Sequence, residues 1–124
     1  LPDFWQVEYF GFNNPTAAPS QDADSDFEDN RSEYIYGTIP TDKSSLFELW
    51  IAPVTNQPAR KKVVFDPRWS DRSYAVQAVT NTPCGPWLGL SGDIVDAGQR
   101  RTVTDTNAVE AVKFYRVKVS KPWP

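Results

Sequence analysis

The sequence predicts a mainly β protein, an antiparallel β-sandwich that follows a short segment of two helices and a loop. Three observations predict this fold. After residue 45, six short stretches have the composition of strands, and several of them alternate apolar and polar side chains. Clusters of turn-forming residues separate these stretches, and no long helical pattern lies between them. Residues 1–45 differ, because they contain few β-branched residues and two short helical patterns around an acidic loop. The 124 residues are therefore expected to divide into a helical segment, 1–45, and a sandwich domain, 46–124.

The first elements along the chain are two short helices. We expect the first over Asp3–Phe10, with Asp3 as its N-cap, and the second over about Asp29–Tyr36. Gly11 and Gly37 follow the two helices, at the position where glycine commonly ends a helix. Between the helices, Pro15–Ser20 has the composition of an extended connector.

The strands follow after Pro40. In the last of them, Phe114, Arg116 and Lys118 fall on one side, while Tyr115, Val117 and Val119 fall on the other, so one face can line a core. Six strands are expected, over Leu46–Ala52, Arg60–Phe65, Ser73–Thr80, Trp87–Leu90, Arg101–Thr104 and Lys113–Ser120. Short antiparallel strands at this spacing are typical of a sandwich.

Composition excludes several classes of function. The net charge of −3, without a basic stripe, argues against nucleic acid as a partner. No apolar run approaches the ~20 residues of a membrane-spanning helix, so no membrane span is expected. The absence of histidine excludes the usual catalytic triads and imidazole zinc sites. The strand region offers only scattered acidic residues in or near loops, so we expect no enzyme. Asp93, Asp96, Asp105 and Glu110 are examples.

The strongest chemical signal is an acidic loop before the second helix. Asp22, Asp24, Asp26 and Glu33 hold the first, third, fifth and twelfth places of a twelve-residue window, which is the spacing of an EF-hand-type calcium loop. Alternate residues of a tight loop point toward one centre, and a glutamate on the following helix can close the site with both oxygens. Glu28 holds the seventh place, where the backbone carbonyl is the usual ligand. These five residues are the predicted ligands of Ca²⁺.

The charge of the loop supports a calcium site, whereas the residue at its sixth place departs from the usual pattern. Residues 22–33 contain six acidic residues and one arginine, a local charge of −5 whose self-repulsion a bound cation would reverse. The sixth place is Phe27, although this place normally has glycine because the backbone turns there with positive φ. The alternative is a solvated acidic loop that binds no metal. The match of four side-chain positions favours calcium.

Two sets of short motifs also resemble known modules. The first set is Leu1-Pro2-Asp3-Phe4-Trp5, Tyr9-Phe10-Gly11, Asp22-Ala23-Asp24-Ser25-Asp26, Glu33-Tyr34, Gly37-Thr38 and Pro40-Thr41-Asp42. The second is Arg72-Ser73-Tyr74-Ala75-Val76-Gln77, Gly85-Pro86-Trp87, Val103-Thr104-Asp105 and Phe114-Tyr115-Arg116-Val117. The first set resembles the thrombospondin type 3-like calcium repeat of bacterial secreted proteins. The second is similar to the Ig/fibronectin type III-like β-sandwich that commonly follows it. This resemblance implies an extracellular or cell-surface, calcium-stabilised protein without catalytic activity.

Two functions remain open at this point. The first is a structural or adhesive module that assembles with further copies into a surface fibre, for which the aromatic and proline residues at 1–5 and 122–124 suggest head-to-tail docking. The second is a carbohydrate-binding accessory module of a larger secreted hydrolase, which would bind polysaccharide on exposed tryptophans. Trp69 and Trp87 are expected to be core or partly buried residues of the sandwich.

Overall fold

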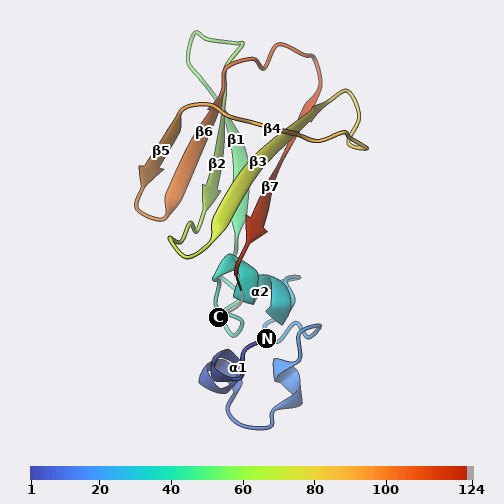
Figure 1. Cartoon of the computed structure of the whole chain (residues 1–124), viewed down its shortest axis with the longest axis vertical. Helices are drawn as coiled ribbons and strands as arrows, with labels where there is room; N and C mark the ends of the chain where they lie inside the picture. Colours follow the sequence, from blue (N-terminus) through green and yellow to red (C-terminus); the bar gives the residue numbers. More distant parts are fainter. Residues whose placement is uncertain (123–124) are drawn as a thin grey trace. The chain divides into compact units, whose positions relative to one another are not determined.

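The computed structural model describes residues 1–122, so Trp123 and Pro124 and the docking suggested for them lie outside the described residues. The protein consists mainly of strands in two antiparallel sheets with few helices, which confirms the mainly β, antiparallel part of the prediction (Figure 1). The chain divides into two compact units. Of the described residues, the helical unit contains 1–47 and 121–122, and the sheet unit contains Glu48–Ser120. Among the described residues, no helix combines the length and apolar character needed to cross a membrane.

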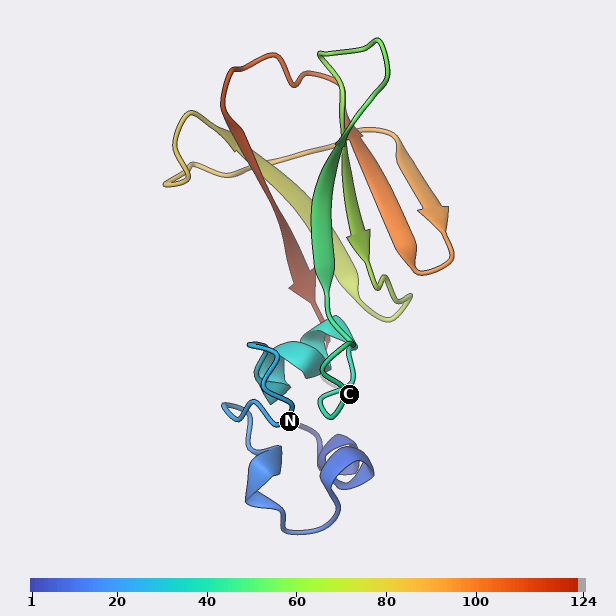
Figure 2. The ribbon, with the colours of Figure 1, turned by 180° about the vertical axis from the view of Figure 1, so that it is seen from behind.

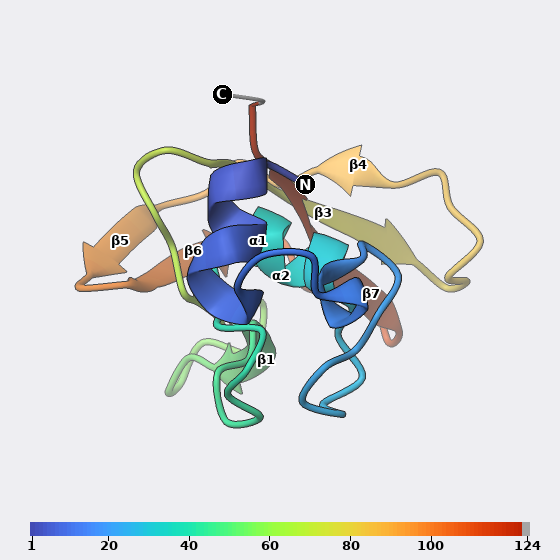
Figure 3. The ribbon, with the colours of Figure 1, turned by 90° about the horizontal axis from the view of Figure 1, so that it is seen from below.

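The helical unit contains α1 (Asp3–Phe10), the 3-10 helix η1 (Pro15–Ala17) and α2 (Asn30–Tyr36) (Figure 3). Both α-helices occur where they were expected. The N-cap of α1 is Pro2, without a side-chain hydrogen bond, so the prediction of Asp3 as N-cap was wrong by one residue. Proline can begin a helix because its fixed φ suits this position. The expected extended connector was also wrong at its start, because η1 forms there.

Local polar groups explain where η1 and α2 begin and end. The side chain of Asn14 accepts a hydrogen bond from the backbone N–H of Thr16, which caps η1. The carboxylate of Asp29 accepts from the N–H of Ser32 and caps α2. Gly37 ends α2 in the left-handed conformation, at φ 77°, where a side chain would be strained.

The apolar core of the helical unit is thin. The ring centroid of Trp5 lies 5.2 Å from that of Tyr9, 6.1 Å from that of Phe10 and 5.8 Å from that of Tyr34 on α2. Apart from Trp5 and Tyr34, the buried apolar side chains of residues 1–47 are Ala17 and Pro40. Since small units need substantial apolar burial to fold, this unit depends on its polar interactions.

The sheet unit contains seven strands. They are β1 (Glu48–Pro53), β2 (Lys61–Asp66), β3 (Ser73–Thr80), β4 (Leu88–Gly89), β5 (Ile94–Ala97), β6 (Arg100–Asp105) and β7 (Lys113–Ser120). One sheet has the order β1-β2-β6-β5, which can be followed from behind in Figure 2, and the other has the order β4-β3-β7. The predicted bounds of β3 and β7 are confirmed, and those of β1, β2, β4 and β6 are within two residues. β5 was not predicted.

The buried side chains of the sheet unit come mainly from β2 and β3. Val63 and Phe65 are fully buried, and the other members of this core are Val64, Val76, Ala78, Val79 and Val103. Trp69 and Trp87 are partly buried, as expected.

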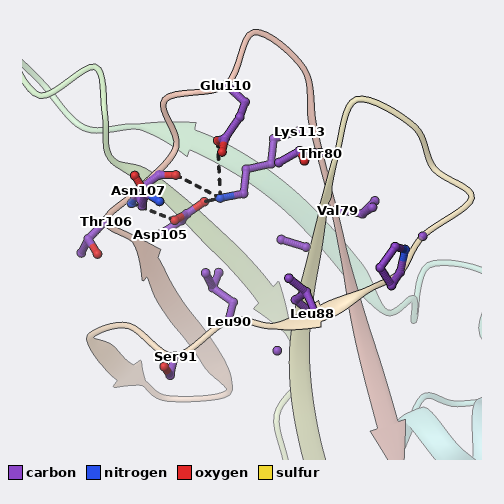
Figure 4. Close-up of a pocket in the computed structure, with 14 residues that line it drawn as sticks. Val79, Thr80, Leu88, Leu90, Ser91, Asp105, Thr106, Asn107, Glu110 and Lys113 are labelled. Carbon is purple, nitrogen blue, oxygen red and sulfur yellow. Dashed lines mark hydrogen bonds and ion pairs between the residues drawn. The ribbon is translucent and has the colours of Figure 1, made fainter.

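One carboxylate is buried beside this core. Asp105, at the end of β6, accepts hydrogen bonds from the hydroxyl of Tyr115 at 2.6 Å and from the N–H of Asn107 at 3.0 Å, and its Oδ2 lies 2.7 Å from Nζ of Lys113. Burial raises the pKa of Asp105, but the donors from Lys113, Tyr115 and Asn107 outweigh burial and hold this pKa below its ordinary value. Asp105, Asn107 and Lys113 of this network line a pocket of about 500 Å³ in the sheet unit, together with Glu110 (Figure 4). Both oxygens of Asp105 already have partners in the network.

Candidate metal centre

Five carboxylates of the helical unit converge in the loop before α2 and on its first turn. Oxygens of Asp22, Asp24 and Asp26 lie within 4.8 Å of one another, and so do oxygens of Asp26, Glu28 and Glu33. Asp26 belongs to both groups. The structure therefore brings together all five residues that the spacing predicted, and such a group of oxygens could hold a metal ion.

The side chains of the loop also organise its backbone. Asp22 accepts hydrogen bonds from the N–H of Asp26 at 3.2 Å and from the N–H of Phe27 at 3.0 Å. Asp26 accepts from the N–H of Glu28 at 2.8 Å. Carboxylates that bind backbone N–H groups in this way hold a tight turn in place.

Glu33 is the most unusual member of the group. Its side chain is fully buried, at 0% exposure, and neither carboxylate oxygen has a hydrogen-bond partner. Oδ2 of Asp24 and Oδ2 of Asp26 are buried without a partner as well. Within residues 1–122, no lysine or arginine forms an ion pair with any of the five carboxylates. Burying unpaired carboxylates is costly, and a divalent cation among them would remove this cost.

The pKa values of Glu33 and Asp24 reflect the cost of burying unpaired carboxylates. Burial, followed by the charges of Asp24, Asp26, Glu28 and Asp22, raises the pKa of Glu33 to about 8. Burial and the neighbouring charge of Asp26 raise the pKa of Asp24 to about 6. The loop therefore retains protons near neutral pH that a bound cation would displace.

Glu28 differs from the role that its place in the pattern suggests. The seventh place of such a loop usually offers its backbone carbonyl, yet here the carboxylate joins the group with Asp26 and Glu33. The N–H of Phe47 donates to Oε1 of Glu28 at 3.3 Å, and the hydroxyl of Thr38 donates to Oε2 at 3.5 Å. Burial raises the pKa of Glu28, although the hydrogen bond from Phe47 acts in the opposite direction. These donors lie 19 and 10 residues away in the chain, so local spacing gave no signal for this orientation.

Asn30 at the ninth place has a structural role that the spacing did not reveal. Its side-chain N–H₂ donates to the carbonyl of Thr16 at 2.7 Å and to the carbonyl of Ala18 at 2.9 Å. The side chain is fully buried, and its Oδ1 has no partner. Asn30 thus joins the beginning of α2 to the segment that contains η1.

Phe27 occupies the sixth place with the positive φ that this place requires. Its φ is 74°, and its side chain is 99% exposed. We predict that Phe27→Gly relieves the strain of this conformation without removing a packing contact. The expected result is a gain of about 1 kcal/mol in the stability of the loop and an increase of several-fold in its affinity for Ca²⁺. Calcium titration of both forms measures this difference.

Phe12→Gly is the matched control for this prediction. Phe12 is also highly exposed, at 82%, but it is not among the residues with positive φ. Glycine there adds conformational entropy to the unfolded chain without relieving strain, so no gain in affinity is expected. An equal gain from both variants would show that loss of an exposed phenyl group, and not backbone strain, is responsible.

Comparisons of the chain with models of protein families, with curated proteins and with solved structures found no match. The chemistry of the five carboxylates is therefore the basis on which a function can be assigned.

Proposed function

We propose that the helical unit binds Ca²⁺ and that the protein is a non-catalytic extracellular structural or adhesive module that calcium stabilises. The observation that carries this proposal is the fully buried, unpartnered carboxylate of Glu33, surrounded by four other carboxylates. The donors are all oxygens, which suits a hard cation such as Ca²⁺. Zn²⁺ prefers thiolate and imidazole, and the chain has no histidine and a single cysteine, Cys84, outside this group.

Calcium would act on this unit through linkage between binding and folding. The ordered loop presents five carboxylates together, whereas the unfolded chain does not, so the metal stabilises the ordered form. At a free calcium concentration 100 times Kd, the stabilisation is about 2.7 kcal/mol. Because the apolar core of the unit is thin, a contribution of this size is large relative to its other sources of stability.

We also infer that the sheet unit is a sandwich of the Ig/fibronectin III type. The order β1-β2-β6-β5 corresponds to strands A, B, E and D of such a sandwich, and β3 and β7 correspond to C and F. Tyr115, near the start of β7, donates to Asp105 ten residues upstream, which is similar to the tyrosine that fixes the corner between strands E and F. This inference agrees with the resemblance of the sequence to secreted modules.

Polysaccharide binding is the second candidate, and the tryptophans argue against it. The guanidinium of Arg100 lies 4.8 Å from the ring centroid of Trp50, and that of Arg116 lies 4.3 Å from the ring centroid of Trp87. A sugar that stacks on either ring would have to displace an arginine from this face. We therefore rank the structural module first.

Assembly through the chain ends also needs a different docking group from the one that the sequence suggested. Trp5 is 7% exposed and packs within the helical unit against Tyr9, Phe10 and Tyr34. Its ring is therefore not available to a second copy while the unit is folded. We keep assembly into a fibre as a proposal without assigning Trp5 a role in it.

Isothermal titration calorimetry of the full chain tests calcium binding directly. We predict one or more Ca²⁺ sites whose affinity rises about tenfold per pH unit between pH 6 and 8, because binding requires the ionised form of Glu33 and releases its proton. Titrations in two buffers of different ionisation enthalpy should show release of about one proton at pH 7. Binding with no pH dependence in this range would contradict a site that contains Glu33, and no heat of binding would leave the loop a solvated acidic segment.

A further inference from the structure

The outer edge of β7 differs from the other sheet edges of the protein. The two sheets end in β1, β5, β4 and β7. β4 has two residues, β5 has four, and β1 ends in Pro53, which cannot donate a hydrogen bond. β7 is eight residues long, contains no proline and pairs with β3 along its whole length without a bulge. Short strands and prolines protect sheet edges, and β7 has neither protection.

The register of β3 and β7 identifies which backbone groups lie on this edge. The N–H of Asn81 donates to the carbonyl of Val112, so these two residues form a hydrogen-bonded pair. From there, the opposite residues run from Thr80 and Lys113 to Ser73 and Ser120. In an antiparallel pair, alternate residues direct both backbone groups to the same neighbour. Phe114, Arg116 and Lys118 therefore face β3 with their backbone. Tyr115, Val117 and Val119 direct their N–H and C=O groups away from it.

The side chains of β7 are also incompletely covered. No residue of β7 is buried, although three residues of its neighbour β3 are. Tyr115, Val117 and Val119 lie on the same side of the strand and are all half-buried. In an Ig-type sandwich, strand G lies at this edge of strand F, and no strand of residues 1–122 pairs there. One additional strand would satisfy the backbone of these residues and cover their side chains.

Charge determines which strand fits. The other face of β7 has Arg116 and Lys118, both exposed, and β3 beside it has no charged residue. The guanidinium of Arg116 already donates to Gln77 of β3 at 2.7 Å and stacks on Trp87, whereas no such contact in the described part of the chain holds the ammonium of Lys118. No acidic residue occurs from Ala111 to Pro122. A second copy of β7 would place these cations opposite one another, which is unfavourable in a cross-strand pair. An incoming strand with acidic residues on this face would instead form favourable pairs.

We infer that the outer edge of β7 binds an extended segment of another polypeptide that alternates apolar and acidic side chains. The apolar side chains would pack beside Val117 and Val119. The acidic ones would lie next to Lys118, and the charge of Arg116, held beside Trp87, would add to the attraction. Backbone hydrogen bonds to Tyr115, Val117 and Val119 would contribute affinity that depends little on the sequence of the bound segment. Its alternating apolar and acidic side chains would provide selectivity.

Amide hydrogen exchange of the full chain tests this inference with synthetic octapeptides as probes. An octapeptide of alternating glutamate and valine should slow exchange at Tyr115, Val117 and Val119. It should leave Phe114, Arg116 and Lys118 unchanged, because their N–H groups already face β3. An octapeptide of alternating lysine and valine should bind about fivefold more weakly or worse. The substitution Lys118→Glu, at an exposed position, places one new carboxylate beside Arg116 and should abolish the preference for the glutamate peptide over the lysine peptide, while leaving the exchange of β3 unchanged.

Three results would overturn the inference. The first is no slowing of the three outward amides by the glutamate peptide. The second is exchange of these amides, in the protein alone, as slow as that of Phe114, Arg116 and Lys118, because the edge would then already be covered. The third is protection that rises with protein concentration in the absence of peptide, which would identify a second copy as the occupant.

Discussion

Replacing Glu33 by glutamine should stabilise the helical unit without calcium and destabilise it, relative to the natural chain, with calcium. Without metal, the substitution removes a buried carboxylate whose pKa is raised from 4.5 to about 8, a cost of about 3 kcal/mol at pH 7. With metal, the same substitution removes a ligand that can supply both oxygens. The distinctive result is that the change in stability has opposite signs with and without calcium. A glutamate with only a structural role would change stability in the same direction under both conditions.

Hydrogen exchange at the N–H of Gly37, which donates to the carbonyl of Glu33, measures this effect in the full chain. In chelator, Glu33→Gln should slow exchange of the Gly37 amide by about 100-fold relative to the natural protein. In excess calcium, the same amide should exchange faster in Glu33→Gln than in the natural protein. Glu8→Gln, at an exposed position of α1, is the matched control and should change neither rate. Faster exchange of Glu33→Gln in chelator would contradict the unpaired state of this carboxylate.

The raised pKa of Glu33 also determines how the stability of the calcium-free helical unit depends on pH. The folded unit holds more protons than the unfolded chain between about pH 4.5 and pH 8, since the pKa of Glu33 is raised. Its stability without metal should therefore fall as pH rises through this range. In Glu33→Gln, most of this dependence should disappear, and Asp24 and Glu28, whose pKa values are also raised, would account for the part that remains.

Replacing Asp105 by alanine should produce a large loss of stability in the sheet unit. The substitution leaves the hydroxyl of Tyr115 without its acceptor and removes the carboxylate that pairs with Lys113. The ammonium of Lys113 keeps the carbonyl of Asn107 and the more distant Glu110, so the expected loss is about 3 kcal/mol. Urea denaturation followed at the amides of Val63 and Phe65 measures it. Addition of calcium should not restore the loss, because Asp105 lies outside the group of five carboxylates.

Two controls separate this effect from a general loss of charge. Asp105→Asn keeps an acceptor for Tyr115 and Asn107 and should lose less than Asp105→Ala. Asp93→Ala, at an exposed position, should change stability little. The pKa of Asp105 is lowered, so its contribution is present above its ordinary pKa and is lost as pH falls below about 4. A sheet unit that keeps its full stability through that range would contradict the role of the network.

The long alternating strands and the loop spacing were predictable, since both depend on local sequence. β3 and β7 have eight residues each, and turn-forming residues flank them. The convergence of Asp22, Asp24, Asp26 and Glu33 and the positive φ at Phe27 agree with the order of residues in a single tight loop. The hydrogen bonds that Asp22 and Asp26 accept from the backbone of this loop all join residues that are close in sequence.

The remaining features depend on contacts that no local pattern contains. β5 has four residues, all exposed, so it lacks the alternation that identifies a half-buried strand. The carboxylate of Glu28 and the amide of Asn30 are positioned by partners 10 to 19 residues away. The faces of Trp50 and Trp87 are covered by arginines of other strands. Each of these requires tertiary structure to be known first.

The path of the chain has a mechanical consequence. The chain passes from the helical unit into the sheet unit between Phe47 and Glu48 and returns between Ser120 and Lys121. Within the helical unit, Nζ of Lys121 lies 5.6 Å from the ring centroid of Tyr34, next to Glu33 in sequence. A pulling force applied at Leu1 and Pro122 would load the contacts of the helical unit before it reached the sandwich. Metal bound by the acidic loop would thus determine how much tension the protein bears before its strands are stretched.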